Sequence, residues 1–198
     1  MKFRRNPVLT KRDLLIGSAA ALAAAHPFAA QAHHTKKYKN FKVAPQFEPQ
    51  TVRYSFKYAP GTIVVDPKNH YLYLIGRWGK ARRYGVGVGR AGLAFKGGAT
   101  VDRKAEWPSW TPTKNMIRRE PGKYAKYAGG VPGGKNNPLG ARALYLYKGG
   151  RDTYYRIHGT TQPKSIGRSV SNGCIRMIND HVIDLYNRVP LGTQVVVL

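Results

Sequence analysis

Cysteine is nearly absent from this chain of 198 residues, which contains Cys174 and no other. A single cysteine cannot form an internal disulfide, so a small disulfide-stapled scaffold is excluded. Acidic residues are also scarce, with 9 against 34 lysines and arginines, and the formal net charge is +25. A protein with this charge is expected to bind an anionic partner: nucleic acid, an anionic membrane or an acidic cell-wall polymer.

Long hydrophobic runs are missing as well. The apolar stretch at residues 14–25 is too short to span a bilayer comfortably. It follows a basic N-terminus and precedes Ala30-Gln31-Ala32, a small-residue cleavage site, so residues 1–32 are predicted to be an export signal. Residues 10–15 resemble a twin-arginine signal with lysine for the first arginine, and an ordinary Sec signal also fits. We therefore expect a periplasmic or cell-envelope protein without a stable membrane span, rather than an N-terminal helix of the fold.

The remaining chain is dominated by signals for strands and turns. Glycine (22 residues) and proline (13 residues) are frequent, which favours turns and short strands over long helices. β-Branched and aromatic runs bounded by turn residues predict strands at 62–65, 71–75, 81–88, 141–147, 154–158 and 194–198.

Other segments carry different signals. Residues 33–60 are basic and proline-spaced, and we interpret them as a flexible arm that ends in a short strand. Residues 99–140 are predicted to be a long loop region with a short helix near 116–126. Apolar residues at helical spacing predict a helix after Cys174, with Asn179 as its N-cap.

Residues 87–92 match the dinucleotide-binding pattern GxGxxG and follow a predicted strand. That pattern functions only where a helix begins directly after it, so that the helix N-terminus meets the pyrophosphate. The residues that follow, 93–98, have no helical periodicity. We therefore reject nucleotide binding.

The segment at residues 156–179 holds Cys174 and, sixteen positions earlier, His158. A thiol becomes a nucleophile as the thiolate, which a neighbouring imidazole can create and stabilise. If the segment folds as strand, loop and strand, the two residues can meet. No carboxylate is well placed to orient the imidazole, so a backbone carbonyl, for instance that of Gly159, is the candidate. The pattern indicates Cys–His acyl transfer.

Two further residues fit that chemistry. Gly173 lets the chain turn tightly before the nucleophile, so the amides of Gly173 and Cys174 are candidates to face an oxyanion. Arg176 lies two positions after the thiol and would point to the same side of an extended segment. There it would hold a substrate carboxylate or favour the thiolate.

Two sequence blocks resemble motifs of a known family: Ile-His-Gly-Thr at 157–160 and Ser-Asn-Gly-Cys-Ile-Arg-Met at 171–177. Together with Trp-Pro-x-Trp at 107–110 and Asn-Pro-Leu-Gly at 137–140, they resemble the L,D-transpeptidase catalytic domain of the YkuD type. The resemblance extends over about residues 62–198. It implies a mostly β, sandwich- or barrel-like single domain at 61–198, with a short helix after the cysteine and no metal or organic cofactor.

The resemblance also implies an activity. The cysteine would attack a peptidoglycan stem peptide after its third residue, usually meso-diaminopimelate, and pass the acyl group from a thioester to an amine. By position, the roles are nucleophile for Cys174, base for His158, orienting carbonyl for Gly159, and oxyanion or substrate contacts for Gly173, Arg176, Ser171 and Asn172. Many members have histidine where this chain has Asn172, and the frequent Thr-Pro-x-Gly before the loop region is absent.

Other interpretations of the residues remain. Papain-like peptidases place the cysteine before the histidine, and sortases place the histidine much further upstream. A zinc site from His158, Cys174 and His181 would lack a fourth ligand. With stem peptides as the expected partner, and an envelope protein's amine as one possible acceptor, the alternatives are an L,D-carboxypeptidase or a non-catalytic, basic peptidoglycan-binding protein. Export disfavours a nucleic-acid partner.

Overall fold

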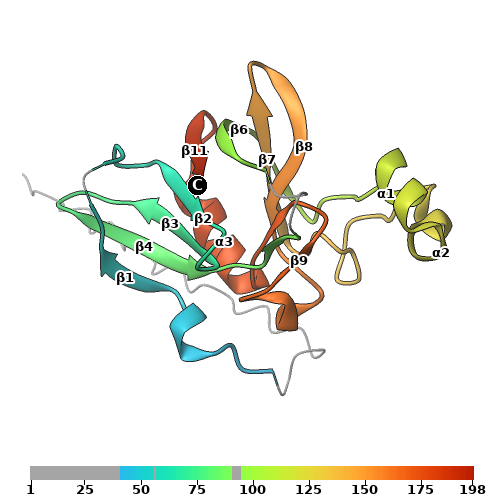
Figure 1. Ribbon diagram of the computed structural model, residues 1–198, viewed down its shortest axis with the longest axis horizontal. Coiled ribbons are helices and arrows are strands. Elements are labelled where there is room, and N and C mark those ends of the chain that lie inside the picture. The colour runs from blue at the N-terminus through green and yellow to red at the C-terminus, as the bar shows by residue number, and fades with distance from the viewer. Residues whose placement is uncertain (1–40, 56, 91–94) are drawn as a thin grey trace, which may run out of the picture. The chain divides into compact units, whose positions relative to one another are not determined.

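The computed structural model describes residues 41–55, 57–90 and 95–198 (Figure 1). Within them the chain forms a nine-stranded mixed sheet and a separate two-stranded one. The strands are β1 (Gln50–Arg53), β2 (Ile63–Asp66), β3 (Tyr71–Ile75), β4 (Lys80–Gly85), β5 (Val88–Gly89), β6 (Gly97–Glu106), β7 (Arg142–Lys148), β8 (Arg151–His158), β9 (Ser169–Ser171), β10 (Ile175–Arg176) and β11 (Thr193–Val197). The helices are η2 (Pro45–Phe47), α1 (Lys114–Arg119), α2 (Pro121–Tyr124), η3 (Ala125–Tyr127), η4 (Pro163–Ser165) and α3 (Asn179–Arg188). The predicted mostly β fold, with a short helix after Cys174, is confirmed.

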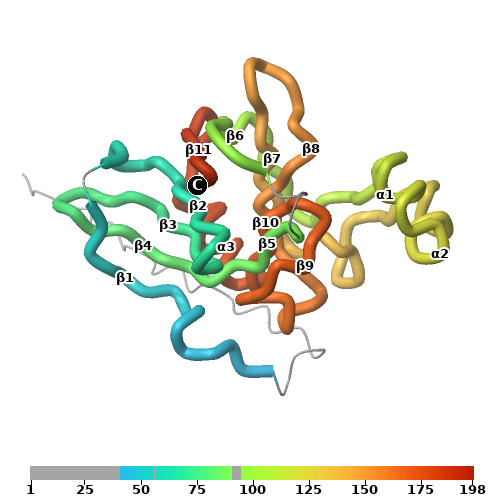
Figure 2. Tube along the Cα trace, in the orientation of Figure 1, coloured from blue at the N-terminus to red at the C-terminus, as the bar shows by residue number. Residues whose placement is uncertain are grey.

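The large sheet joins two antiparallel groups through the last strand of the chain. Its order is β1-β4-β3-β2-β11-β6-β7-β8-β10. β2, β3 and β4 form an antiparallel meander, and β6, β7 and β8 are antiparallel neighbours. β11 lies between the groups, parallel to β2 and antiparallel to β6. In Figure 2, β5, β9 and β10 gather beside β8, and β5 pairs with β9. The C-terminal strand therefore connects the meander to the half of the sheet that carries Cys174.

The core follows the alternation of side chains along the strands. In β2, Ile63 and Val65 belong to the main core cluster, whereas Val64 faces a smaller cluster on the other side. α3 contributes Val182 and Leu185, both fully buried, to the main cluster. Contact between α3 and the sheet removes apolar side chains of both from water, and this packing holds the first turn of α3 in position. The start of α3 lies next to the candidate site.

Two predictions for residues 99–140 need correction. The long-loop interpretation is wrong for residues 99–106, which belong to the ten-residue strand β6. Residues 102–106 of this strand are mostly charged and are exposed or half-buried, so they show no apolar alternation that would reveal a strand. The short helix is present but divided into α1, α2 and η3. Pro121 has no N–H to donate and disfavours a helical residue before it, so Glu120 leaves helical geometry at φ −138°, ψ 65°.

The predicted export signal, residues 1–32, lies outside the described residues. The later part of the predicted arm is described, and it contacts the sheet: β1 pairs antiparallel with β4, and the ring of Phe47 lies 5.7 Å from that of Tyr71. The boundary drawn at residue 60 thus falls after the first strand of the sheet. Among the described residues, no helix has the length and apolar character needed to cross a bilayer.

The GxGxxG segment has a structural explanation in its described part. Val88 and Gly89 form β5, which pairs with β9, and Gly87 bridges to Arg176. Residues 91–94 lie outside the described residues, and β6 follows at Gly97. The described residues 87–90 therefore pair with the chain on both sides of Cys174 and support the loop that carries it.

Candidate active site

The candidate nucleophile and base come from two strands that lie side by side. β10 runs parallel to β8, with Ile175 opposite Ile157 and Arg176 opposite His158. Both isoleucines are buried in the main core. Because side chains alternate along a strand, His158, Cys174 and Arg176 project from the opposite face. There all three line one cavity of about 1140 Å³.

The turn before Cys174 is held by Ser171. Its hydroxyl is buried, accepts the amide hydrogen of Gly173 at 3.1 Å and donates to the carbonyl of Cys174 at 2.6 Å. Gly173 has φ 122°, a conformation that residues with a Cβ rarely adopt. The Gly173 amide is therefore engaged within the loop, which departs from the expectation that it faces an oxyanion. Ser171 likewise contacts the loop's own backbone.

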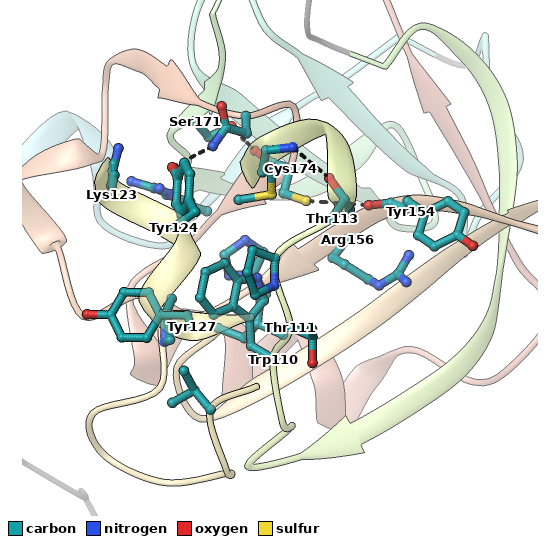
Figure 3. Close-up of a pocket in the computed structure, with 18 of the residues that line it drawn as sticks. Trp110, Thr111, Thr113, Lys123, Tyr124, Tyr127, Tyr154, Arg156, Ser171 and Cys174 are labelled. Atoms are coloured by element: carbon teal, nitrogen blue, oxygen red, sulfur yellow. Dashed lines mark hydrogen bonds between the residues drawn. The ribbon is translucent and has the colours of Figure 1, made fainter. Parts of the chain in front are cut away.

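The thiol of Cys174 is half-buried and donates to the carbonyl of Tyr154, with 3.8 Å between Sγ and O (Figure 3). Burial raises the pKa of Cys174, while the positive charges of Arg156 and Arg176 act in the opposite direction. Because burial is the larger cause, the resting thiol is protonated at neutral pH. For Cys174 to act as a nucleophile, a base would have to take that proton.

His158 is suited to that task. It is 4 % exposed, and its Nδ1 donates to the Gly159 carbonyl at 2.6 Å. Burial, helped by the nearby charge of Arg176, lowers the pKa of His158 to about 3, although the carbonyls of Gly159 and Leu139 favour the protonated ring. The imidazole is thus neutral at physiological pH. With the hydrogen on Nδ1, Nε2 carries the lone pair that can accept a proton.

Asn179 braces the loop that follows His158. Its Oδ1 accepts the backbone N–H groups of Ala141 at 3.1 Å and Thr160 at 3.2 Å. The predicted N-cap role is wrong, because Ile178 takes the cap position and Asn179 points its side chain out of the helix. A Cβ on Gly159 would collide with the Asn179 Oδ1, so this close approach requires glycine. Asn179 thereby helps to place the Gly159 carbonyl.

The cavity is open to a charged substrate. Among the described residues that line it, Lys114, Arg119, Lys123, Lys126, Arg156 and Arg176 are basic and none is acidic. Arg156 forms a double ion pair with Asp152, at 2.7 and 2.8 Å. Arg176 is bound at Nη1 by the neutral Gln162 Oε1, at 3.1 Å. Its charge has no carboxylate partner among the described residues, and a substrate carboxylate could supply one.

Asn172 contacts protein side chains at both ends of its carboxamide. Its Nδ2 donates to the Tyr124 hydroxyl at 2.7 Å, and its Oδ1 accepts from Arg90 Nη2 at 2.9 Å. Arg90 also pairs with Glu120 at 2.8 Å. Figure 3 shows Tyr124 and Trp110 beside the loop that carries Cys174.

Sequence reasoning missed two residues of this site. Arg156 lies two positions before His158, so the period of a strand could have placed both on one face. Tyr124 comes from a helix some fifty positions before Cys174, and no local pattern connects the two. Within the described ranges, no group of three or more His, Cys, Asp or Glu side chains is arranged to hold a metal ion.

Comparison with known proteins agrees with the motifs. The family model for the YkuD-type L,D-transpeptidase catalytic domain matches residues 60–197, from β2 to the end of β11. The chain belongs to the L,D-transpeptidase family. The suspected resemblance is therefore confirmed.

Relatives of this L,D-transpeptidase domain include a curated protein of Escherichia coli K12, "Probable L,D-transpeptidase ErfK/SrfK". It is 41 % identical over 115 residues, which are 57 % of this chain and 36 % of the relative. The chain thus spans only about a third of that protein. "Putative L,D-transpeptidase YqjB" of Bacillus subtilis is 40 % identical over 116 residues, 58 % of this chain and 57 % of its own length.

Two solved structures share the fold. A Brucella melitensis protein described as "Probable carnitine operon oxidoreductase caia" has a TM-score of 0.54 at 57 % identity, covering 79 % of this chain and 96 % of its own. An Enterococcus faecium L,D-transpeptidase C442S mutant has a TM-score of 0.52 at 17 % identity, covering 71 % of this chain and 50 % of its own. The second likeness concerns the fold alone.

Proposed function

We propose that this protein is a peptidoglycan L,D-transpeptidase that works in the cell envelope through an acyl-thioester on Cys174. The observation that carries the proposal is the neutral, buried imidazole of His158 on the strand beside Cys174, on the same face and in the same cavity. Membership of the L,D-transpeptidase family supports the substrate class: stem peptides of peptidoglycan, cleaved after the third residue, usually meso-diaminopimelate.

In the acylation step, Cys174 Sγ attacks the carbonyl carbon of the third stem residue, and its proton passes to Nε2 of His158. The Gly159 carbonyl holds Nδ1–H and stabilises the imidazolium that forms. The carbonyl oxygen becomes an oxyanion. When the intermediate collapses, the imidazolium returns the proton to the departing amine of the terminal D-amino acid, and a thioester remains.

Different groups stabilise the charges in this step. Since the Gly173 amide is bound by Ser171, the oxyanion role falls to the N–H of Cys174. Arg176 offers its guanidinium to a carboxylate of the stem peptide and, by its charge, lowers the cost of the thiolate. Its Gln162 contact is neutral and can be exchanged for a charged one without leaving a buried carboxylate unpaired.

In the second step an amine attacks the thioester, loses a proton to His158 and releases the thiol. The acceptor can be a second stem peptide, which gives a 3→3 crosslink, a free D-amino acid, or an amine of an envelope protein. Water in place of the amine would make the enzyme an L,D-carboxypeptidase. The net charge of +25 and the predicted export signal fit a role in cell-wall biogenesis and cell shape, because the wall is anionic.

The test is to incubate the purified chain and its Cys174→Ala variant with disaccharide-tetrapeptide and to follow the products by mass spectrometry. Loss of the terminal D-alanine together with a new dimer, absent in the variant, is the expected result. Loss of D-alanine without dimer would instead identify the carboxypeptidase. No turnover, combined with retained co-sedimentation with cell-wall sacculi, would refute the enzyme and support a binding protein.

A further inference from the structure

The segment at residues 114–127, here called the lid, contains α1, α2 and η3 and forms one wall of the cavity. In Figure 1, α1 and α2 project away from the sheet. Their connections to it meet at a narrow base, where Trp110 and Val131 exchange two backbone hydrogen bonds of 2.9 and 2.7 Å. A segment attached at a narrow base can swing unless its far side is also held.

The far side of the lid is held at the loop that carries Cys174. The Tyr124 hydroxyl bonds Asn172 at 2.7 Å, and Glu120 bonds Arg90 at 2.8 Å. Arg90 in turn bonds the same Asn172 at 2.9 Å, so both contacts converge on one side chain. Tyr124 is 7 % exposed, and its ring lies edge-on to Trp110 with 6.2 Å between centroids.

We propose that Asn172 is a positioning residue that pins the lid beside Cys174 and thereby excludes water from the acyl-thioester. This rests on the proposed function and adds a role that Asn172 performs through Tyr124 and Arg90 rather than by touching the reacting atoms. Asparagine suits that role. Its carboxamide donates to one partner and accepts from the other at the same time, with no proton to gain or lose near neutral pH.

The chemical consequence concerns which nucleophile ends the reaction. With the lid pinned, the thioester meets an amine that binds in the cavity. With the lid released, water reaches the thioester more often, adds to the carbonyl carbon and gives a free carboxylate and the thiol. Asn172 therefore sets the ratio of transpeptidation to hydrolysis.

Hydrogen exchange tests the pin without any reaction. One hydrogen bond of this kind shifts a local opening equilibrium by about 2- to 10-fold. Tyr124→Phe should speed amide exchange in residues 114–127 by that factor, and Asn172→Ala by at least as much, because it also removes the bond to Arg90. Tyr127→Phe is the matched control, because Tyr127 lies on the same lid, is 37 % exposed and has its ring centroid 5.9 Å from that of Trp110. In this variant the lid should exchange at the wild-type rate.

A double variant makes the test specific. Because the Tyr124 hydroxyl acts through its hydrogen bond to Asn172, Tyr124→Phe combined with Asn172→Ala should speed lid exchange no more than Asn172→Ala alone. If the double variant exchanged faster by the product of the two single factors, the proposed role of Asn172 would be overturned. It would also be overturned if lid exchange in both single variants matched that of Tyr127→Phe. Equal global unfolding midpoints for the variants would show that any change is local.

Product analysis then tests the consequence. With disaccharide-tetrapeptide, Asn172→Ala should raise the share of hydrolysed product relative to dimer by about 2- to 10-fold and raise KM more than it lowers kcat. An unchanged product ratio with a faster-exchanging lid would overturn the water-exclusion role. If neither wild type nor variant turns over, the proposed function fails, while the exchange measurement still decides whether Asn172 holds the lid.

Discussion

Replacing Asn179 by alanine should destabilise the protein far more than its place at the start of a helix would suggest. One atom, Oδ1, accepts hydrogen bonds from the backbone of Ala141 and of Thr160, residues that are 1 % and 3 % exposed. Alanine has no acceptor to offer, and water cannot readily reach either amide. Two buried N–H groups would lose this partner at once.

The size of the effect follows from the cost of leaving a buried donor without its acceptor, about 1–3 kcal/mol for each group. Because the two loops can relax in part, we expect Asn179→Ala to lower the free energy of unfolding by about 2–4 kcal/mol. In a domain of this size that corresponds to a fall in melting temperature of about 5–15 °C.

Urea unfolding and thermal melting measure the loss directly, with two matched variants. Asn179→Asp keeps an oxygen in the same place and should remain within about 1 kcal/mol of the wild type. Asn187→Ala removes an exposed asparagine from the same helix, α3, and should also be nearly neutral. A loss confined to Asn179→Ala is the expected result.

The reasoning would be refuted if Asn179→Ala unfolded at the same urea concentration as Asn187→Ala. The Gly159 carbonyl belongs to the same peptide group as the Thr160 N–H that Asn179 binds, and it orients His158. Folded Asn179→Ala protein should therefore also turn over more slowly. Normal turnover in that variant would show that the brace acts on stability alone.

Two further predictions concern buried side chains. Folded His158 stays neutral down to about pH 3, whereas in the unfolded chain it takes up a proton near pH 6.5. The unfolded state therefore binds more protons between these values, and stability should fall as the pH drops through them, by at most about 1.4 kcal/mol per pH unit from this group. Urea unfolding from pH 7 to 4 should show a shallower fall for His158→Asn, and an equal fall would contradict the assignment. Tyr84, fully buried, donates to Asp184 at 2.9 Å, so Tyr84→Phe should cost about 1.5–3 kcal/mol. Tyr73→Phe, at a half-buried tyrosine, serves as the control. Equal unfolding midpoints for the two variants would refute a stabilising role of the Tyr84–Asp184 hydrogen bond.

Much of the chemistry could be predicted because it depends on residue types at short range. Cys174 and His158 are separated by one loop, and a strand–loop–strand fold was enough to bring them to one cavity. The strands of the meander were predictable because apolar and turn residues alternate at short intervals. β6 was missed because its charged stretch hides a strand whose pairing comes from β7 and β11, which lie far away in the chain.

The sequence by itself determined the family, the mostly β class and the identity of the candidate nucleophile and base. The tertiary structure alone decided what the asparagines and the Gly173 amide do. Asn179 braces two loops rather than capping its helix, and Asn172 joins Tyr124 and Arg90, which lie 48 and 82 positions away. The physical reason is that a carboxamide can bond to any donor or acceptor within about 3 Å. Only the packing of distant segments determines which partners those are.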